Sequence, residues 1–253
     1  MAHKTLINGT SYEVSGGRTL VNGTGYGIAG GRTLVSGTGH DVSFGTKLGT
    51  LPTGSVVYLN EGGSPVAFYV AHHNYESALN GSGRTLLVRK DVSVRRLFDE
   101  SASSSRKNNY ADNSLDVWFN GEYKATLDAN VQSAIGETTF YYTVGNGNKN
   151  VTTLTRSIFA LSVTEFGMTG DYTNVEGSVL DTAELLKIAY LNGEATDQWT
   201  RTPSTNGKVY MYYVLSSGRI QAAYTLVRGA RPCFTLPSDT VFDSTTLTFK
   251  KST

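Results

Sequence analysis

The segment of residues 199–237 carries the residue types that most often form a recognition surface. Trp199 and Arg201 precede a polar stretch at residues 204–208, and residues 209–214 then interleave three tyrosines with apolar side chains. Tyr, Arg, Ser, Asn and Gly combine rigid contact area with adaptable hydrogen bonding, as in paratopes and interface hot spots. We therefore expect a displayed binding surface here. The alternative is a core strand with one wet face.

The tyrosines make a further prediction if residues 209–214 form a strand. Successive side chains of a strand point to opposite faces, so Tyr210 and Tyr212 would share one face. After a turn come further aromatic or cationic residues: Arg219, Tyr224 and Arg228. Tyrosine suits proteins as well as sugars, so the residue types leave the class of ligand open.

Metal chemistry has less support in the sequence. Adjacent side chains on a strand point to opposite faces, so His72 and His73 cannot reach one ion without a bulge, and a polar role at a strand end is predicted. An ordered cation bound by acidic residues is an alternative, although these residues lack the spacing of an EF-hand. The residues are Asp112, Asp116, Glu165, Asp171, Glu176 and Asp181. Glu165 and Glu176 flank a loop and are predicted to order it through backbone amides.

Catalytic chemistry is limited by the single cysteine, Cys233. One cysteine excludes a disulfide framework within the chain and any multi-cysteine metal site. A reactive thiol needs an exposed, electropositive setting, whereas residues 231–236 read as an apolar strand, so a free buried cysteine is expected. Residues 145–148 read as a turn, and Walker, Ser-His-Asp and HExxH signatures do not occur. The chain is therefore predicted to be a non-enzymatic binding protein without a cofactor.

The charge and the hydrophobic content of the chain disfavour nucleic acid and membranes as partners. The 253 residues include 22 basic and 21 acidic side chains, a net charge of +1, whereas nucleic-acid binders carry a clear basic excess. A hydrophobic content of 39%, with 15 tyrosines and 10 phenylalanines, is enough for a folded core. No apolar signal segment opens the chain and no apolar run approaches the length of a membrane span, so no membrane insertion is expected.

The first fifty residues contain a fourteen-residue repeat, because residues 4–10 recur at 18–24 and again at 32–38. Each copy reads as a short strand, a turn at Asn-Gly or Ser-Gly, and a second short strand. One copy offers too few apolar side chains to close a core. Packing the same element from several chains around an axis would solve this problem. We predict that residues 1–50 are a homotrimeric, β-prism-like oligomerisation element, with a Gly-rich arm of a monomer as the alternative.

Residues 51–253 are predicted to form a ligand-binding domain of the α+β class. Short β-branched or aromatic runs bounded by turns predict strands at 55–59, 65–72, 84–90, 157–162, 209–215, 221–226 and 231–236. Short helices are predicted after three capping residues, Asn113, Asp128 and Thr182. The long connections at residues 99–112 and 171–181 are expected to be functional or tied down by packing.

Six segments of this domain together resemble a bacterial and phage domain family of unassigned function: residues 83–89, 116–121 with Tyr123, 134–136 followed by 140–142, 161–165, 198–203 and 230–237. The resemblance covers roughly residues 55–238. That family is similar to the C-type-lectin-like fold of the formylglycine-generating-enzyme type and to variable proteins diversified by retroelements. The resemblance therefore implies a C-type-lectin-like domain with short helices and long loops. Phage tropism determinants of this class display the fold on a trimeric fibre tip, some with an N-terminal β-prism.

In such variable proteins a framework near the C-terminus holds a patch whose codons are mutagenised at adenines. The resemblance implies a framework of Trp199, Arg201, Pro203, Arg231 and Pro232. Lys208, Met211 and Gln221 cannot arise from the AAY codons typical of these systems and are expected to be fixed. The implied ligand-binding residues are Ser204, Thr205, Asn206, Tyr210, Tyr212, Arg219, Ala222, Ala223, Tyr224, Leu226 and Arg228.

The sequence thus predicts a homotrimeric phage or prophage receptor-binding protein, located on a virion tail or fibre tip or on a bacterial surface. Its partner would be a bacterial cell-surface protein or glycan. The first alternative is a structural virion or surface protein whose C-terminal domain only decorates. An oxidase or sulfatase-modifying enzyme is the least favoured, because the enzyme relatives use cysteines for oxidative chemistry.

Overall fold

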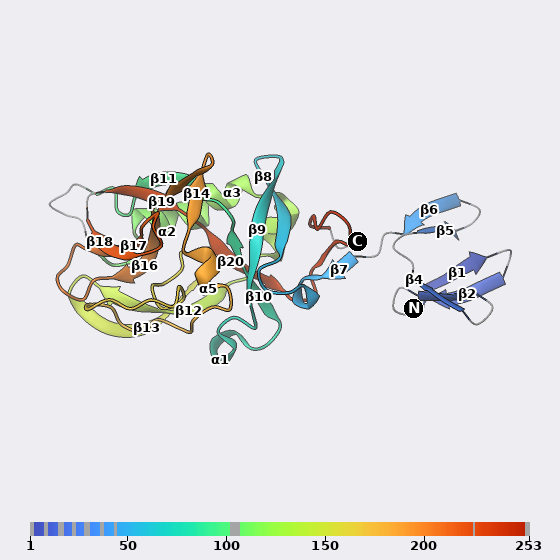
Figure 1. Cartoon of the computed structure of the whole chain (residues 1–253), viewed down its shortest axis with the longest axis horizontal. Coiled ribbons are helices and arrows are strands. Elements are labelled where there is room, and N and C mark those ends of the chain that lie inside the picture. Colours follow the sequence, from blue (N-terminus) through green and yellow to red (C-terminus); the bar gives the residue numbers. More distant parts are fainter. Residues whose placement is uncertain are drawn as a thin grey trace.

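The structure is a computed structural model of the chain (Figure 1). It describes residues 45–101, 107–224 and 226–250, and the backbone of strands within residues 3–42. These early strands pair as antiparallel hairpins: β1 (His3–Ile7) with β2 (Thr10–Val14), β3 (Arg18–Val21) with β4 (Thr24–Gly27), and β5 (Gly31–Val35) with β6 (Thr38–Val42). Each hairpin coincides with one copy of the repeat. The predicted pairs of short strands are therefore confirmed. The turns predicted between them lie outside the described residues, and the trimeric assembly stays a prediction.

The main body begins earlier than residue 51. β7 (Gly45–Lys47) pairs with β21 (Val241–Asp243) near the other end of the chain, and a 3-10 turn (Leu48–Thr50) follows. Leu48 is fully buried in the core. Residues 45–50 therefore pack with the main body.

A four-stranded sheet, in the order β20-β10-β9-β8, forms one half of the main body. Its members are β8 (Val56–Glu61), β9 (Ser64–His73), β10 (Arg84–Arg89) and β20 (Cys233–Pro237), all antiparallel. β8 and β9 are joined through Gly62 and Gly63, whose positive φ angles are those that glycine adopts without strain. The strands predicted near residues 55–59, 65–72, 84–90 and 231–236 are confirmed.

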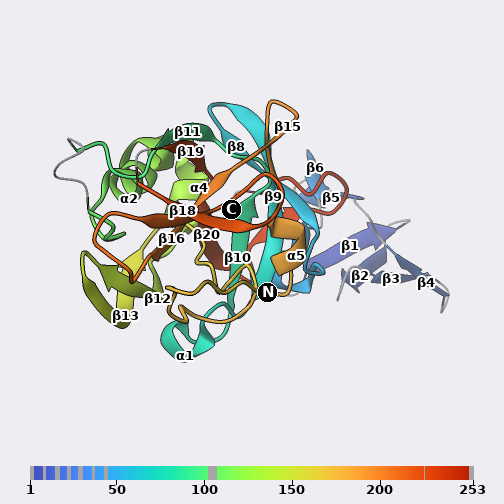
Figure 2. The same ribbon diagram turned by 60° about the vertical axis from the view of Figure 1, so that its left-hand side comes forward.

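A five-stranded sheet, in the order β11-β19-β16-β17-β18, forms the other half. Its members are β11 (Val94–Leu97), β16 (Gln198–Pro203), β17 (Met211–Val214), β18 (Ile220–Ala223) and β19 (Val227–Ala230). Two hairpins flank it: β12 (Thr138–Gly145) with β13 (Asn148–Arg156), and β14 (Ala189–Leu191) with β15 (Glu194–Thr196). Figures 1 and 2 place the β12–β13 hairpin and the α2 segment on opposite sides of the five-stranded sheet.

The helices are short: α1 (Ser77–Asn80), α2 (Ser114–Trp118), α3 (Lys124–Thr126), α4 (Ala129–Ala134) and α5 (Ala183–Leu186), with a π-helical turn (Phe119–Tyr123) joining α2 to α3. Asn113 caps α2 as predicted, because its side chain accepts a hydrogen bond from the Asp116 amide. Asp128 and Thr182 stand at the starts of α4 and α5 without a side-chain capping bond. Thr182 instead donates to the carbonyl of Ala71.

The predicted α+β class is wrong, because strands make up 41% of the structure and helices 15%, and several small sheets form the fold. The largest omission is the β12–β13 hairpin, whose Gly145–Asn148 turn was recognised but whose flanking strands were not. β12 alternates buried and half-buried residues along most of its length, as a strand packed on one face does. The strand predicted at residues 157–162 is wrong: residues 158–162 are buried, but the segment is irregular and pairs with β20 through a single bridge between Phe159 and Cys233.

Candidate ligand-binding surface

The segment predicted as a recognition surface begins on a central strand of the five-stranded sheet (Figure 1). β16 carries Trp199, Arg201 and Pro203, and all of its residues are buried. Arg231 and Pro232, which precede β20, are buried as well. The residues implied as a framework are therefore core residues, and a rigid support of this kind is what a displayed patch requires.

Arg201 is the most deeply buried charge of this framework, with no exposed surface. Its guanidinium contacts both carboxylate oxygens of Glu165, at 2.6 and 2.8 Å, and donates to the carbonyls of Ala160 and Tyr141 at 2.9 and 3.0 Å. The ring of Phe140 lies 4.7 Å below it. Burial alone would lower the pKa of Arg201, but the Glu165 carboxylate raises it above its ordinary value. Arg201 therefore stays charged and joins β16 to β12 and to the loop after residue 160.

The two glutamates predicted to order the loop between them bind backbone amides outside that loop and so hold its two ends. Glu165 accepts a hydrogen bond from the Ser162 amide at 2.7 Å, and Glu176 accepts one from the Thr143 amide at 2.7 Å. Glu176 also accepts from the hydroxyl of Thr202 on β16 at 2.6 Å. Its burial raises the pKa of this carboxyl group. Among the residues that the structure describes, no group of three or more His, Cys, Asp or Glu side chains could hold a metal ion.

Trp199 and Arg231 bind the backbone of neighbouring segments through their side chains. The indole of Trp199 donates to the carbonyl of Arg96 on β11 at 3.0 Å and packs edge-on against Tyr213. Arg231 donates to the carbonyls of Arg89, Lys90 and Leu186 at 2.7–2.8 Å. Burial lowers the pKa of Arg231 to about 10, so it remains a cation at neutral pH. Both side chains thus fix backbone positions.

Asn108 is a supporting residue that the sequence did not indicate. It is fully buried, and its side-chain amide donates to the carbonyls of Ser204 and Tyr210 at 2.9 and 3.1 Å. Its side-chain oxygen accepts from the Asn146 amide at 2.6 Å, and its own amide donates to the carbonyl of Lys208 at 2.8 Å. One asparagine therefore fixes both ends of the loop at residues 204–210 and ties it to the β12–β13 turn. It lies in a polar connection of ordinary composition, so no sequence pattern distinguished it.

The predicted ligand-binding residues differ in exposure. Asn206, Tyr210, Arg219, Tyr224 and Leu226 are exposed, and Thr205, Ala222 and Arg228 are partly buried. Ser204, Tyr212 and Ala223 are buried and cannot contribute to a displayed surface.

Tyr210 and Tyr212 were predicted to share one face of a strand, but only Tyr212 lies on the strand. β17 begins at Met211, and all four of its residues are buried. Tyr212 is 7% exposed, because the loop at residues 170–173 lies over it: a Cβ at Gly170 would be 3.1 Å from its hydroxyl. Burial raises the pKa of Tyr212. Both faces of this strand are therefore covered.

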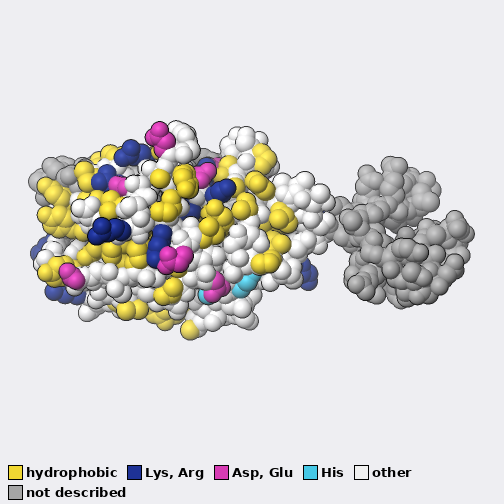
Figure 3. All heavy atoms as spheres, viewed as in Figure 1, with side chains coloured by type: hydrophobic (Ala, Val, Ile, Leu, Met, Phe, Trp, Pro, Cys, Tyr) yellow, Lys and Arg dark blue, Asp and Glu magenta, His cyan; other side chains and the backbone are white. Residues whose placement is uncertain are grey.

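Tyr210 and Tyr224 form an exposed aromatic pair. Met211 pairs with Ala223 across the β17–β18 hairpin, so the residues just beyond them come face to face. Their rings meet edge-on with centroids 5.4 Å apart, while 41% and 43% of these side chains stay exposed. Leu226 and Val227 continue the exposed apolar surface. We call these four residues the tyrosine patch, and Figure 3 shows hydrophobic side chains gathered at the left-hand end of the molecule, where Figure 1 places this hairpin.

The two arginines of the predicted set lie apart from the tyrosine patch. Arg219 is at the other end of the hairpin, since Val214 pairs with Ile220 there, and three residues of strand span roughly 10 Å. Arg228 is held in the fold by an ion pair with Asp197 at 2.9 Å and lies 4.5 Å over the ring of Tyr213. The sequence therefore predicted one group of ligand-binding residues. In the fold, Arg219 lies far from the tyrosine patch and Arg228 has a structural role.

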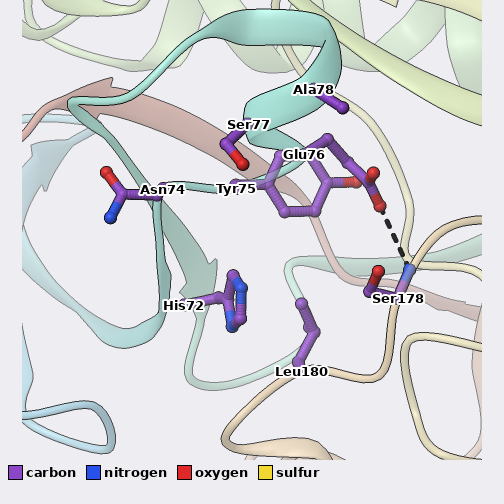
Figure 4. Close-up of a pocket in the computed structure, with 8 residues that line it drawn as sticks. All are labelled: His72, Asn74, Tyr75, Glu76, Ser77, Ala78, Ser178 and Leu180. Atoms are coloured by element: carbon purple, nitrogen blue, oxygen red, sulfur yellow. Dashed lines mark hydrogen bonds between the residues drawn. The ribbon is translucent and has the colours of Figure 1, made fainter.

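A polar cavity of about 170 Å³ lies elsewhere, between the end of β9, α1 and residues 178–180 (Figure 4). Tyr75 is one of the residues that line it and donates to Glu165 at 2.5 Å, so the cavity adjoins the Arg201 network. Glu76 accepts from the Ser178 amide at 3.1 Å, and burial followed by the charge of Glu165 raises its pKa. His72 pairs with Asp181 at 3.1 Å. The polar groups of this cavity thus anchor the loop at residues 171–181, which the sequence predicted to be tied down.

The histidine and the cysteine considered for metal binding and catalysis, His73 and Cys233, have structural roles. His73 contacts the Thr85 hydroxyl and the Leu51 carbonyl at 3.0 and 2.8 Å, which confirms a polar role at a strand end. Cys233 is fully buried and donates to the carbonyl of Phe159 at 3.0 Å, as expected of a free buried cysteine. Burial raises the pKa of its thiol, which disfavours the reactive thiolate. Within the described part of the chain, no helix is long and apolar enough to cross a membrane.

Comparison with known proteins identifies a family but no characterised relative. No curated protein and no solved structure matches the chain. A family model described as a domain of unknown function (DUF6273) matches residues 82–238, which include every strand of the five-stranded sheet and the whole tyrosine patch. The chain therefore belongs to the DUF6273 family.

Proposed function

We propose that this chain is a ligand-display protein, a receptor-binding protein of a phage or prophage that binds a bacterial surface ligand through the tyrosine patch. The observation that carries the proposal is the contrast between Tyr210 and Tyr224, both more than two-fifths exposed, and the buried framework directly behind them. Exposed aromatic side chains are costly to solvate. A fold that holds two of them on a rigid support is therefore suited to binding a ligand there.

The framework makes such a contact efficient. Asn108 fixes the main chain at Tyr210, and the hairpin register places Tyr224 opposite it. Each tyrosine has only two rotatable side-chain bonds, so little conformational entropy is lost when a ligand binds. A buried Arg201–Glu165 pair and a buried Arg231 stabilise the strands that carry the hairpin. Binding would therefore need little rearrangement of the protein.

Assembly and location complete the proposal. The protein would act without catalysis or a cofactor, as a homotrimer assembled through the repeat, at a virion tail or fibre tip or on a bacterial surface. Three copies of the patch on one axis would raise the overall affinity for a repetitive surface well above that of one copy. A net charge of +1 disfavours nucleic acid as the partner.

We further propose a relationship to the variable proteins diversified by retroelements. The exposed residues of the implied set, which are Asn206, Tyr210, Arg219, Tyr224 and Leu226, would be the positions at which variation changes the ligand. Of the three positions expected to be fixed, Met211 is buried, whereas Lys208 and Gln221 are exposed. A nearby near-copy of the gene region encoding residues 199–237, differing only at adenines, would establish diversification. If the gene region has no such copy, a receptor-binding protein with a fixed sequence, or a decoration protein, is favoured instead.

The test of the function is binding of the full chain to bacterial envelope preparations. Tyr210→Ser/Tyr224→Ser should lower the affinity by roughly tenfold or more, since interface tyrosines commonly contribute over 1 kcal/mol each. Tyr190→Ser is the matched control, because Tyr190 is 44% exposed but lies on β14, outside the patch. Equal binding by the wild type and the double variant would refute the proposal. Envelope binding by none of the proteins would favour the alternative, a structural decoration of a virion or surface.

A further inference from the structure

Three lysines stand around the loop that leads into the tyrosine patch. Lys107, Lys149 and Lys208 are exposed, and each comes from a different segment of the chain. Asn108 joins these segments: it follows Lys107, its amide donates to the carbonyl of Lys208, and its side chain accepts from Asn146 in the turn before Lys149. The lysines are therefore gathered by the same buried residue that positions Tyr210.

Lys208 lies against the turn itself. A Cβ added at Gly147 would be 3.0 Å from Cε of Lys208, so the side chain of Lys208 packs against this turn. Asn174 donates to the carbonyl of Lys149 at 2.7 Å and fixes the start of β13. The backbone at both lysines is thus held by hydrogen bonds.

The ammonium groups of these lysines form no ion pair in the part of the chain that the structure describes. No carboxylate there lies within ion-pair distance of Lys107, Lys149 or Lys208. The carboxylate of Asp99 accepts a hydrogen bond from the backbone amide of Lys107 and not from its ammonium group. Figure 3 shows Lys and Arg side chains at the same end of the molecule as the hydrophobic patch. A chain with a net charge of only +1 therefore concentrates positive charge beside the patch.

We propose that this end of the molecule binds an anionic polysaccharide, with Lys107, Lys149 and Lys208 contacting its carboxylate or phosphate groups while Tyr210 and Tyr224 stack on its sugar rings. The inference rests on the proposed function and names its ligand class. Lysine is suited to anions as a mobile point charge, and aromatic rings offer flat apolar faces. The exposed amides of Asn146 and Asn206 supply both donors and acceptors for hydroxyl groups. A linear sugar chain also needs a narrower footprint than the roughly 20–30 residues that a protein interface uses on each side.

The experiment compares three polymers on immobilised full-length protein: alginate, a polysaccharide with carboxylates; dextran, a neutral polysaccharide; and polyglutamate, an acidic polypeptide. Alginate should bind in preference to both others and weaken as salt increases, because exposed charges are screened. Lys149→Glu/Lys208→Glu should slow alginate association by about tenfold or more. The control is Lys47→Glu/Lys124→Glu, which makes the same change in net charge away from Asn108 and should behave as the wild type.

The outcomes separate this inference from the proposed function. Equal loss in both lysine pairs, or polyglutamate binding as well as alginate, would overturn the anionic polysaccharide as ligand. If the tyrosine double variant loses envelope binding while the lysine pair does not, the display function stands and its ligand is not anionic. If the tyrosine double variant binds envelopes as the wild type does, the proposed function itself fails. Circular dichroism spectra should be the same for all variants, since all four lysines are at least partly exposed.

Discussion

Replacement of Arg201 by Met tests whether the buried charge network supports the display surface. The substitution keeps most of the side-chain volume but removes the partner of Glu165, whose carboxylate is also fully buried. It also takes donors away from the carbonyls of Ala160 and Tyr141. A buried charge left without its partner costs about 3–5 kcal/mol of folding free energy. That is a large part of the roughly 5–15 kcal/mol that stabilises a typical domain.

Urea unfolding followed by tryptophan fluorescence measures this loss. With an m-value of about 2 kcal/mol per molar urea, a loss of about 4 kcal/mol lowers the midpoint by about 2 M. Arg201→Met/Glu165→Gln should recover part of the loss, because the unpaired charge is then gone. Arg219→Met, at an exposed arginine, should change stability by less than about 0.5 kcal/mol. If Arg201→Met stays within about 1 kcal/mol of the wild type, the network is not a main support of the framework.

Three further predictions concern other parts of the molecule. The raised pKa of Glu76 means that the folded protein holds a proton that the unfolded chain has released, so stability falls as pH rises from the ordinary glutamate pKa through the raised one. Glu76→Gln should therefore be more stable than the wild type at about pH 7 in urea titrations, and the difference should vanish below about pH 4. Cys233 should react with a thiol reagent only after denaturation, and labelling of the native protein within minutes would contradict its burial. Deletion of residues 1–44 should give a folded monomer by light scattering, and a trimer would refute the oligomerisation role of the repeat.

The residues that could be identified from the sequence are those whose role follows from local pattern. The fourteen-residue repeat predicted the hairpins, since Asn-Gly turns and short β-branched runs act within a few residues. Asn113 was recognised as a helix cap for the same reason. The framework of Trp199, Arg201 and Arg231 was recognised by resemblance, and its burial agrees with the supporting role that the resemblance implied.

The class of fold and the composition of the surface were predicted less well. Short helical starts at Asn113, Asp128 and Thr182 suggested a larger helical share than one or two turns each provide. The β12–β13 hairpin was missed because its threonines and tyrosines are not a clear apolar run. Pairing between strands distant in the chain determines such sheets, and no local pattern specifies the partner.

The order of amino acids shows which residue types are available for recognition: tyrosines near the C-terminus, a single cysteine in an apolar strand, and acidic residues suited to accepting hydrogen bonds from backbone amides. Which of these residues face solvent depends on how the chain folds. Tyr212 is covered by a loop more than thirty residues earlier in the chain, whereas Tyr210, two positions away, is exposed beside Tyr224. Asn108 gained its role from three segments that meet only in the fold. Exposure and hydrogen bonding depend on what packs against a residue, and in this protein those neighbours come from far along the chain.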